Sequence, residues 1–205
     1  MNLLNWNCRE FRNSRKVCEL HLLVKKKFPK VVFLLETKCR RNKVEFIHNK
    51  LNFEHSFVVD CIGRGGGIAM MWKKELHADL QSHSKAKWML TRFYGSPIVA
   101  KQVETLDDFS LSDLGYKKSR FTWCNNREGM EFTKERLDRA IGNKEWNMFF
   151  STFEVHVLPV LNSDHCPLFI SCYNVNKTSN REKRNLRYKA NWSRQEDYSE
   201  IVKLA

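Results

Sequence analysis

The chain has 205 residues, 42% of them hydrophobic, and a formal net charge of +13 at pH 7. This length suffices for one domain with a sizeable core, and the composition excludes a disordered chain. No apolar run is long enough to cross a bilayer, so we expect no membrane partner. The basic residues are not spread evenly and form three clusters, at residues 25–30, 38–41 and 177–189. Such an excess favours a polyanionic partner, above all nucleic acid, over a merely solvated basic surface.

Seven cysteines are scattered along the chain, with no close pair and no zinc-ligand spacing. The N-terminus has no basic segment followed by an apolar stretch, so the sequence predicts no secretory signal. Together these features predict an intracellular chain with reduced thiols. The basic clusters are also compatible with nuclear import.

Apolar runs near the N-terminus predict two strands with a helix between them. Residues 2–7 form a short apolar strand, and residues 31–36 form a continuous β-branched run typical of a strand buried on both faces. The intervening segment predicts an amphipathic helix, capped by Asn13 or Ser14 and ended by Pro29. This helix would bury one face, formed by Val17, Leu20, Val24 and Phe28.

The next segment predicts a second amphipathic helix at residues 42–51 and a hairpin around a glycine run. Strand-like stretches at 56–61 and 67–72 flank that run. A phosphate cradle is the functional alternative, but the run lacks the Gly-Lys-Ser/Thr ending of a nucleotide-binding loop. A turn between two paired strands therefore explains it better.

The remainder of the domain alternates short strand-like segments with one more helix. Strands are predicted within residues 87–95, 119–126, 134–143, 153–158 and 167–172, and a helix at 144–150. This order predicts one layered α/β domain over residues 1–173. The polar and basic residues 174–205 predict a linker or tail.

Polar residues stand where several of these apolar runs end. They are Asn7, Glu36, Tyr94, Asp138, Asp164 and His165. Strand ends that meet at one rim of a sheet form ligand sites in layered α/β folds. At such a rim a carboxylate can hold Mg²⁺, and a histidine beside an acid can act on a phosphate or a water. Taken singly, each residue is explained as well by a solvated strand end, a turn cap or a surface ion pair, so the set carries the prediction.

In this order, the set resembles the endonuclease/exonuclease/phosphatase superfamily, which includes exonuclease III, the apurinic endonucleases and DNase I. The stretches that carry the resemblance are NWNCR, LLETK, FYGSP, RLDRAIGN and NSDHCPL. GGGIAMMWK and LSDLGYKKSRFTWCNNR are similar to the endonuclease domain of plant LINE-type (non-LTR) retrotransposon polyproteins, and residues 174–205 resemble the segment leading to their reverse transcriptase. The resemblance implies a DNase I-like four-layer α/β sandwich and Mg²⁺-dependent phosphodiester hydrolysis that nicks DNA.

The resemblance implies that the first three polar residues bind the reacting groups. Glu36 would hold Mg²⁺, for which Mn²⁺ could substitute. Asn7 and Tyr94 would contact the scissile phosphate. DNA is the implied partner, and we expect further contacts to it from Arg9, Lys38, Arg40, Arg120 and Asn125.

The last three residues of the set would form the acid–base part of the site. His165 would contact the phosphate or position the attacking water. Asp164 and Asp138 would orient His165 and the metal shell.

The chain departs from the family pattern at a central motif. Family members carry Gly-Asp-Phe/Tyr-Asn on a strand between the tyrosine and the RLD segment, with an Asp that positions or deprotonates water and an Asn that binds phosphate. The motif is absent here, and only 44 residues separate Tyr94 from Asp138. Asp107 and Asp108 look like remnants of the helix beyond the motif, and residues 81–88 mark a second gap. We therefore expect an incomplete sandwich with one or two strands deleted, which would leave neighbouring strands with unpaired ladders.

The turn after the first strand differs as well. EFRN follows NWNCR where relatives have a glycine-rich turn, so Glu10 and Phe11 would stiffen or re-aim the turn beside Asn7. General-base help is typically worth about 10²–10⁴-fold in rate, so loss of the motif predicts impaired or absent catalysis. The leading hypothesis is thus a decayed retroelement endonuclease.

Two other functions stay open at this point. One is a nucleic-acid-binding remnant without catalysis, which would use the same basic clusters. The other is a different phosphoesterase of the superfamily, acting on RNA tails or inositol phosphates, against which the retroelement-like motifs argue.

Overall fold

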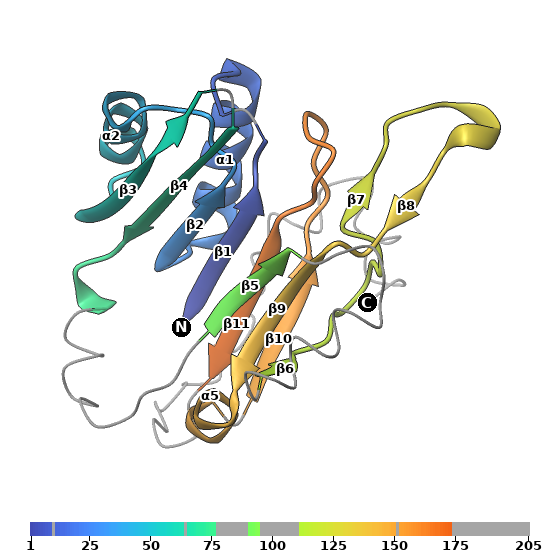
Figure 1. Ribbon diagram of the computed structural model, residues 1–205. Helices are drawn as coiled ribbons and strands as arrows, with labels where there is room; N and C mark the ends of the chain where they lie inside the picture. Colours follow the sequence, from blue (N-terminus) through green and yellow to red (C-terminus); the bar gives the residue numbers. More distant parts are fainter. Residues whose placement is uncertain (10, 64, 77–89, 95–110, 151, 174–205) are drawn as a thin grey trace, which may run out of the picture. The chain divides into compact units, whose positions relative to one another are not determined.

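The first β-sheet brings the beginning and the end of the predicted domain together. Its strand order is β10-β11-β1-β2-β4-β3 (Figure 1). The strands are β1 (Asn2–Asn7), β2 (Val31–Leu35), β3 (His55–Ile62), β4 (Gly65–Trp72), β10 (Thr152–Val157) and β11 (Leu168–Tyr173). β1 and β2 run parallel, and the other neighbours in this sheet are antiparallel. The C-terminal ends of β1 and β2 therefore lie at the same edge.

This computed structural model describes residues 1–9, 11–63, 65–76, 90–94, 111–150 and 152–173, and of 90–94 the backbone alone. Several predictions lie outside these residues: Glu10, the gap at 81–88, the acids Asp107 and Asp108, and the tail 174–205. The boundary after residue 173 and the nature of the tail accordingly stay predictions.

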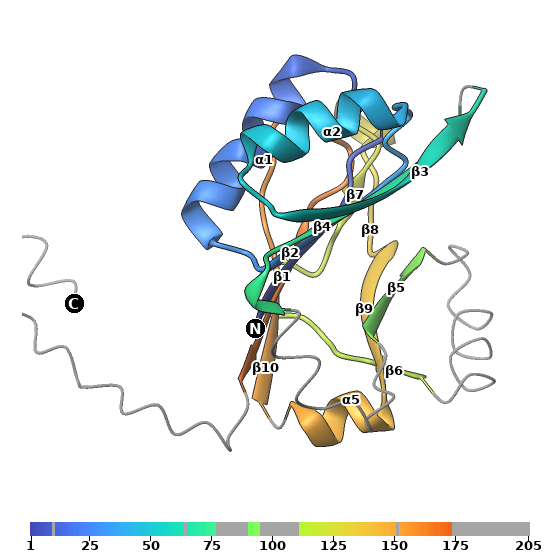
Figure 2. The same ribbon diagram turned by 90° about the vertical axis from the view of Figure 1, so that its left-hand side faces the viewer.

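Two helices cover one face of the first sheet, α1 (Ser14–Lys27) and α2 (Arg41–Lys50) (Figure 2). The side chain of Asn13 accepts a hydrogen bond from the amide of Arg15, which confirms Asn13 as the N-cap of α1. The apolar cluster between helices and sheet includes Leu4, Trp6, Leu20, Leu34, Val44 and Ile47, all 0% or 1% exposed. Neither helix, nor any other in the described ranges, is long and apolar enough to span a membrane.

The prediction that Phe28 belongs to the buried face of α1 is wrong. Phe28 is 75% exposed and has a φ of 48°, because it is the left-handed C-cap that precedes Pro29. A residue in this conformation leaves the helical path, so its side chain no longer follows the apolar stripe. The three other predicted positions, Val17, Leu20 and Val24, do pack against the core.

A second, smaller sheet packs against the first. Its order is β5-β9-β6, with β5 (Leu90–Tyr94), β6 (Leu111–Asp113) and β9 (Asp138–Asn143), and both pairings are antiparallel. Ala140 of β9 and Trp146 of α5 (Lys144–Phe149) share a core with Val155, Leu168 and Ile170 of the first sheet. This packing of two sheets confirms the α/β sandwich, with a second sheet of three strands in the part of the chain that the structure describes.

β5 and β9 pair directly over residues 90–94 and 138–142. These are the strands before and after the place of the missing motif. β9 also pairs with β6 on its other side, over residues 141–143. The expected unpaired ladder is therefore partly filled at β9, because β5 pairs with residues 138–142 at one edge and β6 with residues 141–143 at the other.

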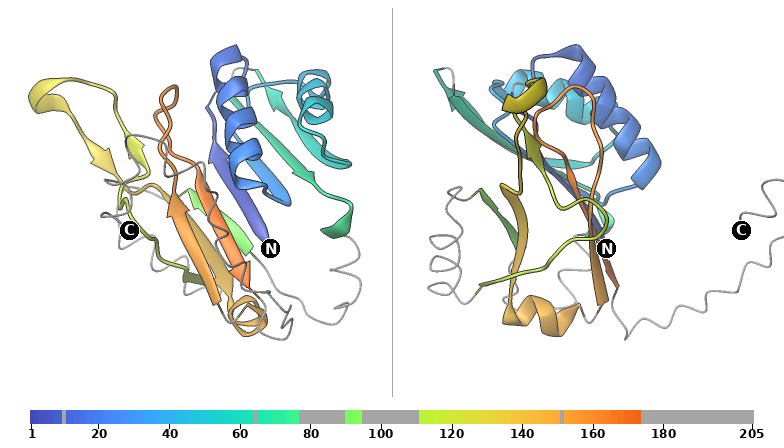
Figure 3. Two further views of the ribbon diagram at one scale, coloured as in Figure 1. Left: turned by 180° about the vertical axis from the view of Figure 1, so that it is seen from behind. Right: turned by 90° about the vertical axis from the view of Figure 1, so that its right-hand side faces the viewer.

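A two-stranded hairpin, β7 (Trp123–Cys124) and β8 (Lys134–Glu135), projects from the end of β9 (Figures 1 and 3). A short 3₁₀ turn, Gly129–Glu131, forms its tip. The side chains of Met130 and Phe132 near this tip are 106% and 46% exposed, so the hairpin is not part of the core.

Leu20→Ala should lower the free energy of unfolding by about 2–5 kcal/mol, because it removes a fully buried side chain between α1 and the sheet. Leu22→Ala in the same helix is the matched control, since Leu22 is 66% exposed, and should change stability by less than about 0.5 kcal/mol. Urea unfolding of both variants measures the difference. Equal effects would contradict the packing of α1 described here.

Candidate active site at the strand ends

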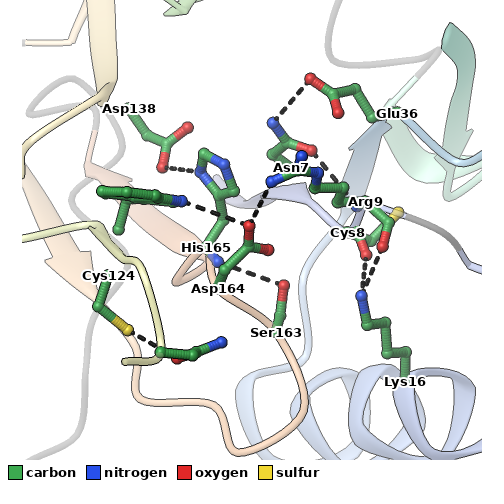
Figure 4. A network of polar contacts seen from close by, with 12 residues as sticks. Asn7, Cys8, Arg9, Lys16, Glu36, Cys124, Asp138, Ser163, Asp164 and His165 are labelled. Atoms are coloured by element: carbon green, nitrogen blue, oxygen red, sulfur yellow. Dashed lines mark hydrogen bonds and ion pairs between the residues drawn. The ribbon is translucent and has the colours of Figure 1, made fainter. Parts of the chain in front are cut away.

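Two polar side chains meet where β1 and β2 end. Asn7 closes β1 and pairs with Leu35, the last residue of β2, so Glu36 follows directly at the sheet edge. The amide of Asn7, a residue 1% exposed, donates from Nδ2 to Oε1 of Glu36 at 3.3 Å (Figure 4). Glu36 has a φ of 50°, a left-handed conformation that few non-glycine residues adopt. Such conformations cluster at functional sites, where the surrounding structure holds them.

Glycines at the start of β4 hold the loop that carries Glu36. The amides of Thr37 and Lys38 donate to the carbonyls of Gly67 and Gly66 at 3.1 and 3.0 Å. A Cβ at Gly67, whose φ is +86°, would lie 2.5 Å from Oγ1 of Thr37. β3 and β4 pair as the hairpin that the sequence predicts, while the glycines at 65–67 begin β4 and also support the Glu36 loop.

A buried acid–base pair joins the two sheets. Asp138 opens β9, and His165 lies in the loop between β10 and β11. Nδ1 of His165 and Oδ2 of Asp138 are 2.9 Å apart, and the residues are 1% and 0% exposed. An ionised carboxylate can only accept, so Nδ1 donates in this bond. The structure thus pairs two residues that are 27 positions apart in the chain.

Three further hydrogen bonds fix this pair. The amide of Asp138 donates to Oγ1 of Thr122 at 2.9 Å, and the amide of His165 donates to Oγ of Ser163 at 3.3 Å. The indole of Trp6 donates to the carbonyl of His165 at 2.9 Å. Sequence reasoning missed these three supporting side chains. A lone hydroxyl or indole carries no motif of its own, although all three residues fall within stretches that carry the family resemblance, namely NWNCR, LSDLGYKKSRFTWCNNR and NSDHCPL.

Asp164 faces Arg9 (Figure 4) and also contacts Trp123. Its Oδ2 accepts from the guanidinium of Arg9 at 2.7 Å and from the indole of Trp123 at 3.3 Å. Burial alone would raise the pKa of Asp164. The hydrogen bond from Arg9, with the electrostatic attraction of His165 and Arg9, outweighs burial and holds this pKa below its usual value. Asp164 is therefore ionised at neutral pH and engaged by a cation.

One polar network links the predicted catalytic residues (Figure 4). The amide of Arg9 donates to Oδ1 of Asn7 at 3.3 Å, while its guanidinium binds Asp164. Arg9 thus connects the two halves of the site: Asn7 with Glu36, and Asp164 with the neighbouring His165–Asp138 pair. The side chains brought together are those of Asn7, Glu36, Asp138, Asp164 and His165. Tyr94 ends β5, and its Cα is paired in register with that of Asp138, so β5 ends at the same rim.

The five predicted nucleic-acid contacts lie in different surroundings. Arg9 belongs to the network, and Arg40 and Arg120 are exposed. Lys38 is half-buried in the loop after β2. The side chain of Asn125 organises the β7–β8 hairpin: it accepts from two backbone amides of the hairpin at 3.2 and 3.1 Å and donates to a carbonyl at 2.6 Å. These hydrogen bonds give the side chain of Asn125 a structural role within the hairpin.

Glu36 fits a water-rich magnesium site. Mg²⁺ is commonly bound by one or two carboxylates and completes its shell with waters and substrate phosphates. Glu36 offers a half-buried carboxylate at the strand ends, with Asn7 on Oε1. Among the described residues, no group of three or more His, Cys, Asp or Glu is placed to enclose a metal ion. The donor set therefore suits an ion shared with a phosphate ligand.

A cleft of about 580 Å³ opens beside the network. It lies between the β7–β8 hairpin and the loop ahead of β11, and Arg9, Trp123, Ser163 and Asp164 line it. Guanidinium and amide groups can bind phosphate oxygens, and an indole can stack on a planar ring. The cleft is thus suited to a phosphorylated ligand.

Solved structures share this fold. An AP endonuclease from Archaeoglobus fulgidus matches with a TM-score of 0.61 at 12% identity, over 84% of this chain and 99% of that one. The 3′ phosphatase NExo from Neisseria, bound to a product DNA hairpin, matches with 0.60 at 13% identity, over 84% and 99%. TDP2 from D. rerio, in complex with a single-strand DNA product, matches with 0.55 at 15% identity, over 85% and 99%.

The chain has the DNase I-like fold of the AP endonucleases, with an incomplete sandwich, and it resembles the nucleases and phosphodiesterases of that superfamily. At these identities the likeness concerns the fold alone. No protein-family model and no curated protein matches the sequence. The closer resemblance to plant LINE-type endonucleases accordingly stays a prediction from sequence motifs.

Gly67→Ala should destabilise the chain by about 1–3 kcal/mol more than Gly66→Ala, measured by urea unfolding. Both glycines have positive φ, +86° and +72°, so both substitutions strain the backbone. Only a Cβ at Gly67 meets an atom, Oγ1 of Thr37, which already accepts from the amide of Cys39. Equal losses in the two variants would show that the Glu36 loop does not rest on β4.

Arg9→Met should raise the pKa of Asp164 toward its ordinary value of about 4, as followed by NMR titration of the carboxyl carbon. The folded-state pKa is depressed, so the Arg9–Asp164 contact contributes stability above about pH 4, and this contribution is lost as pH falls through the folded pKa. Arg12→Met, which alters an exposed neighbour bonded to the Lys38 carbonyl, should leave the Asp164 titration unchanged. An Asp164 pKa that does not respond to Arg9→Met would refute the assigned cause.

Proposed function

We propose that this chain is the DNA-nicking phosphodiester hydrolase domain of a retroelement, with impaired catalysis. The observation that carries the proposal is the buried His165–Asp138 pair beside Asn7 and Glu36, in a fold shared with AP endonucleases. The retroelement origin rests on the sequence motifs, such as LSDLGYKKSRFTWCNNR, and on the likeness of residues 174–205 to a segment leading to a reverse transcriptase.

Each residue of the network would handle one part of the hydrolysis. Asp138 accepts from Nδ1, which fixes the tautomer of His165 and assigns the contact with phosphate or water to Nε2. Asn7, together with Tyr94 at the end of β5, would donate to oxygens of the scissile phosphate. Glu36 would hold Mg²⁺, or Mn²⁺ in its place, which supplies charge neutralisation at the phosphate oxygens when bound.

Two features support impaired catalysis. The Gly-Asp-Phe/Tyr-Asn motif is absent from the sequence, and with it an acid that would position water and an amide that would bind phosphate. Asp164 is engaged by Arg9 and Trp123. Its Oδ2 is occupied by two donors, one of them a cation, so it is no ready substitute for the lost acid.

The alternative is a nucleic-acid-binding domain without turnover. The Arg9–Asp164 contact favours it, because this contact occupies an acid of the site and leaves phosphate contacts as the remaining use of the rim. The charge of +13 supports a nucleic-acid ligand in both cases, as do the DNA molecules bound to NExo and TDP2. Metal-dependent turnover is what separates the two functions.

The test is nicking of supercoiled plasmid by the purified chain with Mg²⁺, with Mn²⁺ and with EDTA. We expect plasmid binding that weakens with salt, and nicking at least about 10²-fold slower than by the Archaeoglobus fulgidus enzyme assayed alongside. His165→Ala and Glu36→Gln should abolish any nicking. Their matched controls are His156→Ala, on β10 beside Glu154, and Glu45→Gln, on the exposed face of α2.

Nicking at a rate equal to the reference enzyme, dependent on metal and on His165, would overturn the claim of impairment. Binding without any nicking would favour the non-catalytic alternative. If the chain neither binds nor nicks plasmid, a nucleic-acid function at this rim is refuted. Hydrolysis of a small phosphoester while plasmid stays intact would point to another phosphoesterase of the superfamily.

A further inference from the structure

Lys16 is the one lysine among the described residues that is buried, with 9% of its surface exposed. It is the third residue of α1, whose first turn contains no acidic residue. A helix N-terminus carries partial positive charge, so a buried cation there is unfavourable for the helix itself. Burial of an ammonium is unfavourable as well unless its hydrogen bonds are replaced. The reason for a lysine at this position must therefore lie outside α1.

The contacts of Lys16 are with the turn that follows β1. Its Nζ donates to the carbonyl of Cys8 at 2.9 Å and to the carbonyl of Arg9 (Figure 4). Arg9 has a φ of 29°, so the turn is left-handed at a non-glycine residue. One ammonium thus binds two successive carbonyls and holds a backbone conformation that the residue type disfavours.

This turn sets the direction of two site residues. The amide of Arg9 donates to Oδ1 of Asn7, which leaves Nδ2 of Asn7 to face Glu36. The guanidinium of Arg9 reaches Asp164, next to His165. A rotation of the peptide between residues 8 and 9 would therefore disturb both halves of the network.

The opposite side of the turn is fixed independently. The side chain of Phe11 is fully buried in the core, and its amide donates to the carbonyl of Thr37 at 2.8 Å. Phe11 anchors the chain after the turn, and Cys8, whose amide donates to the carbonyl of Leu35, anchors it before the turn. Lys16 supports the peptide between these two anchors through the carbonyl of Cys8, and it binds the carbonyl of Arg9 as well.

We propose that Lys16 is a positioning residue of the active site: by binding the carbonyls of Cys8 and Arg9, it aims Asn7 at Glu36 and Arg9 at Asp164. Lys16 also lines the cleft beside the network, so its charge lies close to a phosphate bound there. The alignment of Asn7 follows from the geometry alone, whereas the effect on nucleic acid rests on the proposed function.

The test compares Lys16→Met, which keeps length and removes the ammonium, with Lys16→Arg, which keeps the charge and the donors. Lys25→Met, an exposed position near the other end of α1, is the control. The readouts are the side-chain amide signals of Asn7 in ¹H–¹⁵N spectra, assigned with Asn7→Ala, and the Kd for a short DNA duplex at fixed salt. A purely structural lysine would change the unfolding midpoint without moving the Asn7 signals.

In Lys16→Met we expect displaced Asn7 signals and a Kd raised about tenfold, the order typical for residues that orient a site. Lys16→Arg should restore both to near the unaltered chain, and Lys25→Met should leave the Asn7 signals in place. Native Asn7 signals in a folded Lys16→Met would overturn the proposal, whatever the unfolding midpoint. If Lys16→Met does not fold, Lys16→Gln replaces it in the same measurement. Displaced Asn7 signals in Lys16→Gln would support the proposal, and native Asn7 signals would overturn it.

The two readouts separate this proposal from the proposed function. If the unaltered chain binds no duplex, the nucleic-acid function fails, yet the Asn7 signals still test Lys16. If it binds duplex and Lys16→Met leaves both the signals and the Kd unchanged, the function stands and the role of Lys16 is refuted.

Discussion

The hydrogen bond between His165 and Asp138 is the contact on which the site depends. Asp138 opens β9 of the second sheet, whereas His165 lies in the loop between β10 and β11 of the first, and a buried carboxylate is tolerated only when its hydrogen bonds are replaced. The pair therefore fixes the start of β9 against the loop ahead of β11. Thr122, Ser163 and Trp6 hold the two ends of this contact. The sandwich and the candidate site are thus two aspects of one packing arrangement.

The two halves of the site depend on the sandwich to different degrees. Asn7 and Glu36 stand on neighbouring parallel strands, so the first sheet and its helices are sufficient to hold them. Asp138 stands on the second sheet, which is the one shortened by the loss of the motif. Because β5 pairs directly with β9, the register of Asp138 is kept although a strand is missing. The pairing of β5 with β9 therefore holds Asp138 without the motif, as the proposed loss of activity requires.

Local sequence patterns predicted the elements that are determined mainly by apolar burial or by helix capping. The apolar runs at 2–7 and 31–36 became β1 and β2, and Asn13 caps α1, because burial and capping are decided within a few residues. The prediction that Phe28 is buried failed because Phe28 is the left-handed C-cap of α1, a conformation that hydrophobic periodicity does not reveal. The unpaired ladder expected at β9 is partly filled by β5 and β6, because strand pairing is decided by which segments meet, and sequence order does not contain that.

By itself the sequence determined the set of polar residues at strand ends, the absence of the central motif, and the excess of positive charge. Only the tertiary structure decided that Asp164 is bound by Arg9, and that a buried Lys16 supports the turn beside Asn7. Charge and hydrogen-bond capacity are properties of residue types. Which carbonyl or carboxylate satisfies them depends on backbone groups brought together from distant parts of the chain.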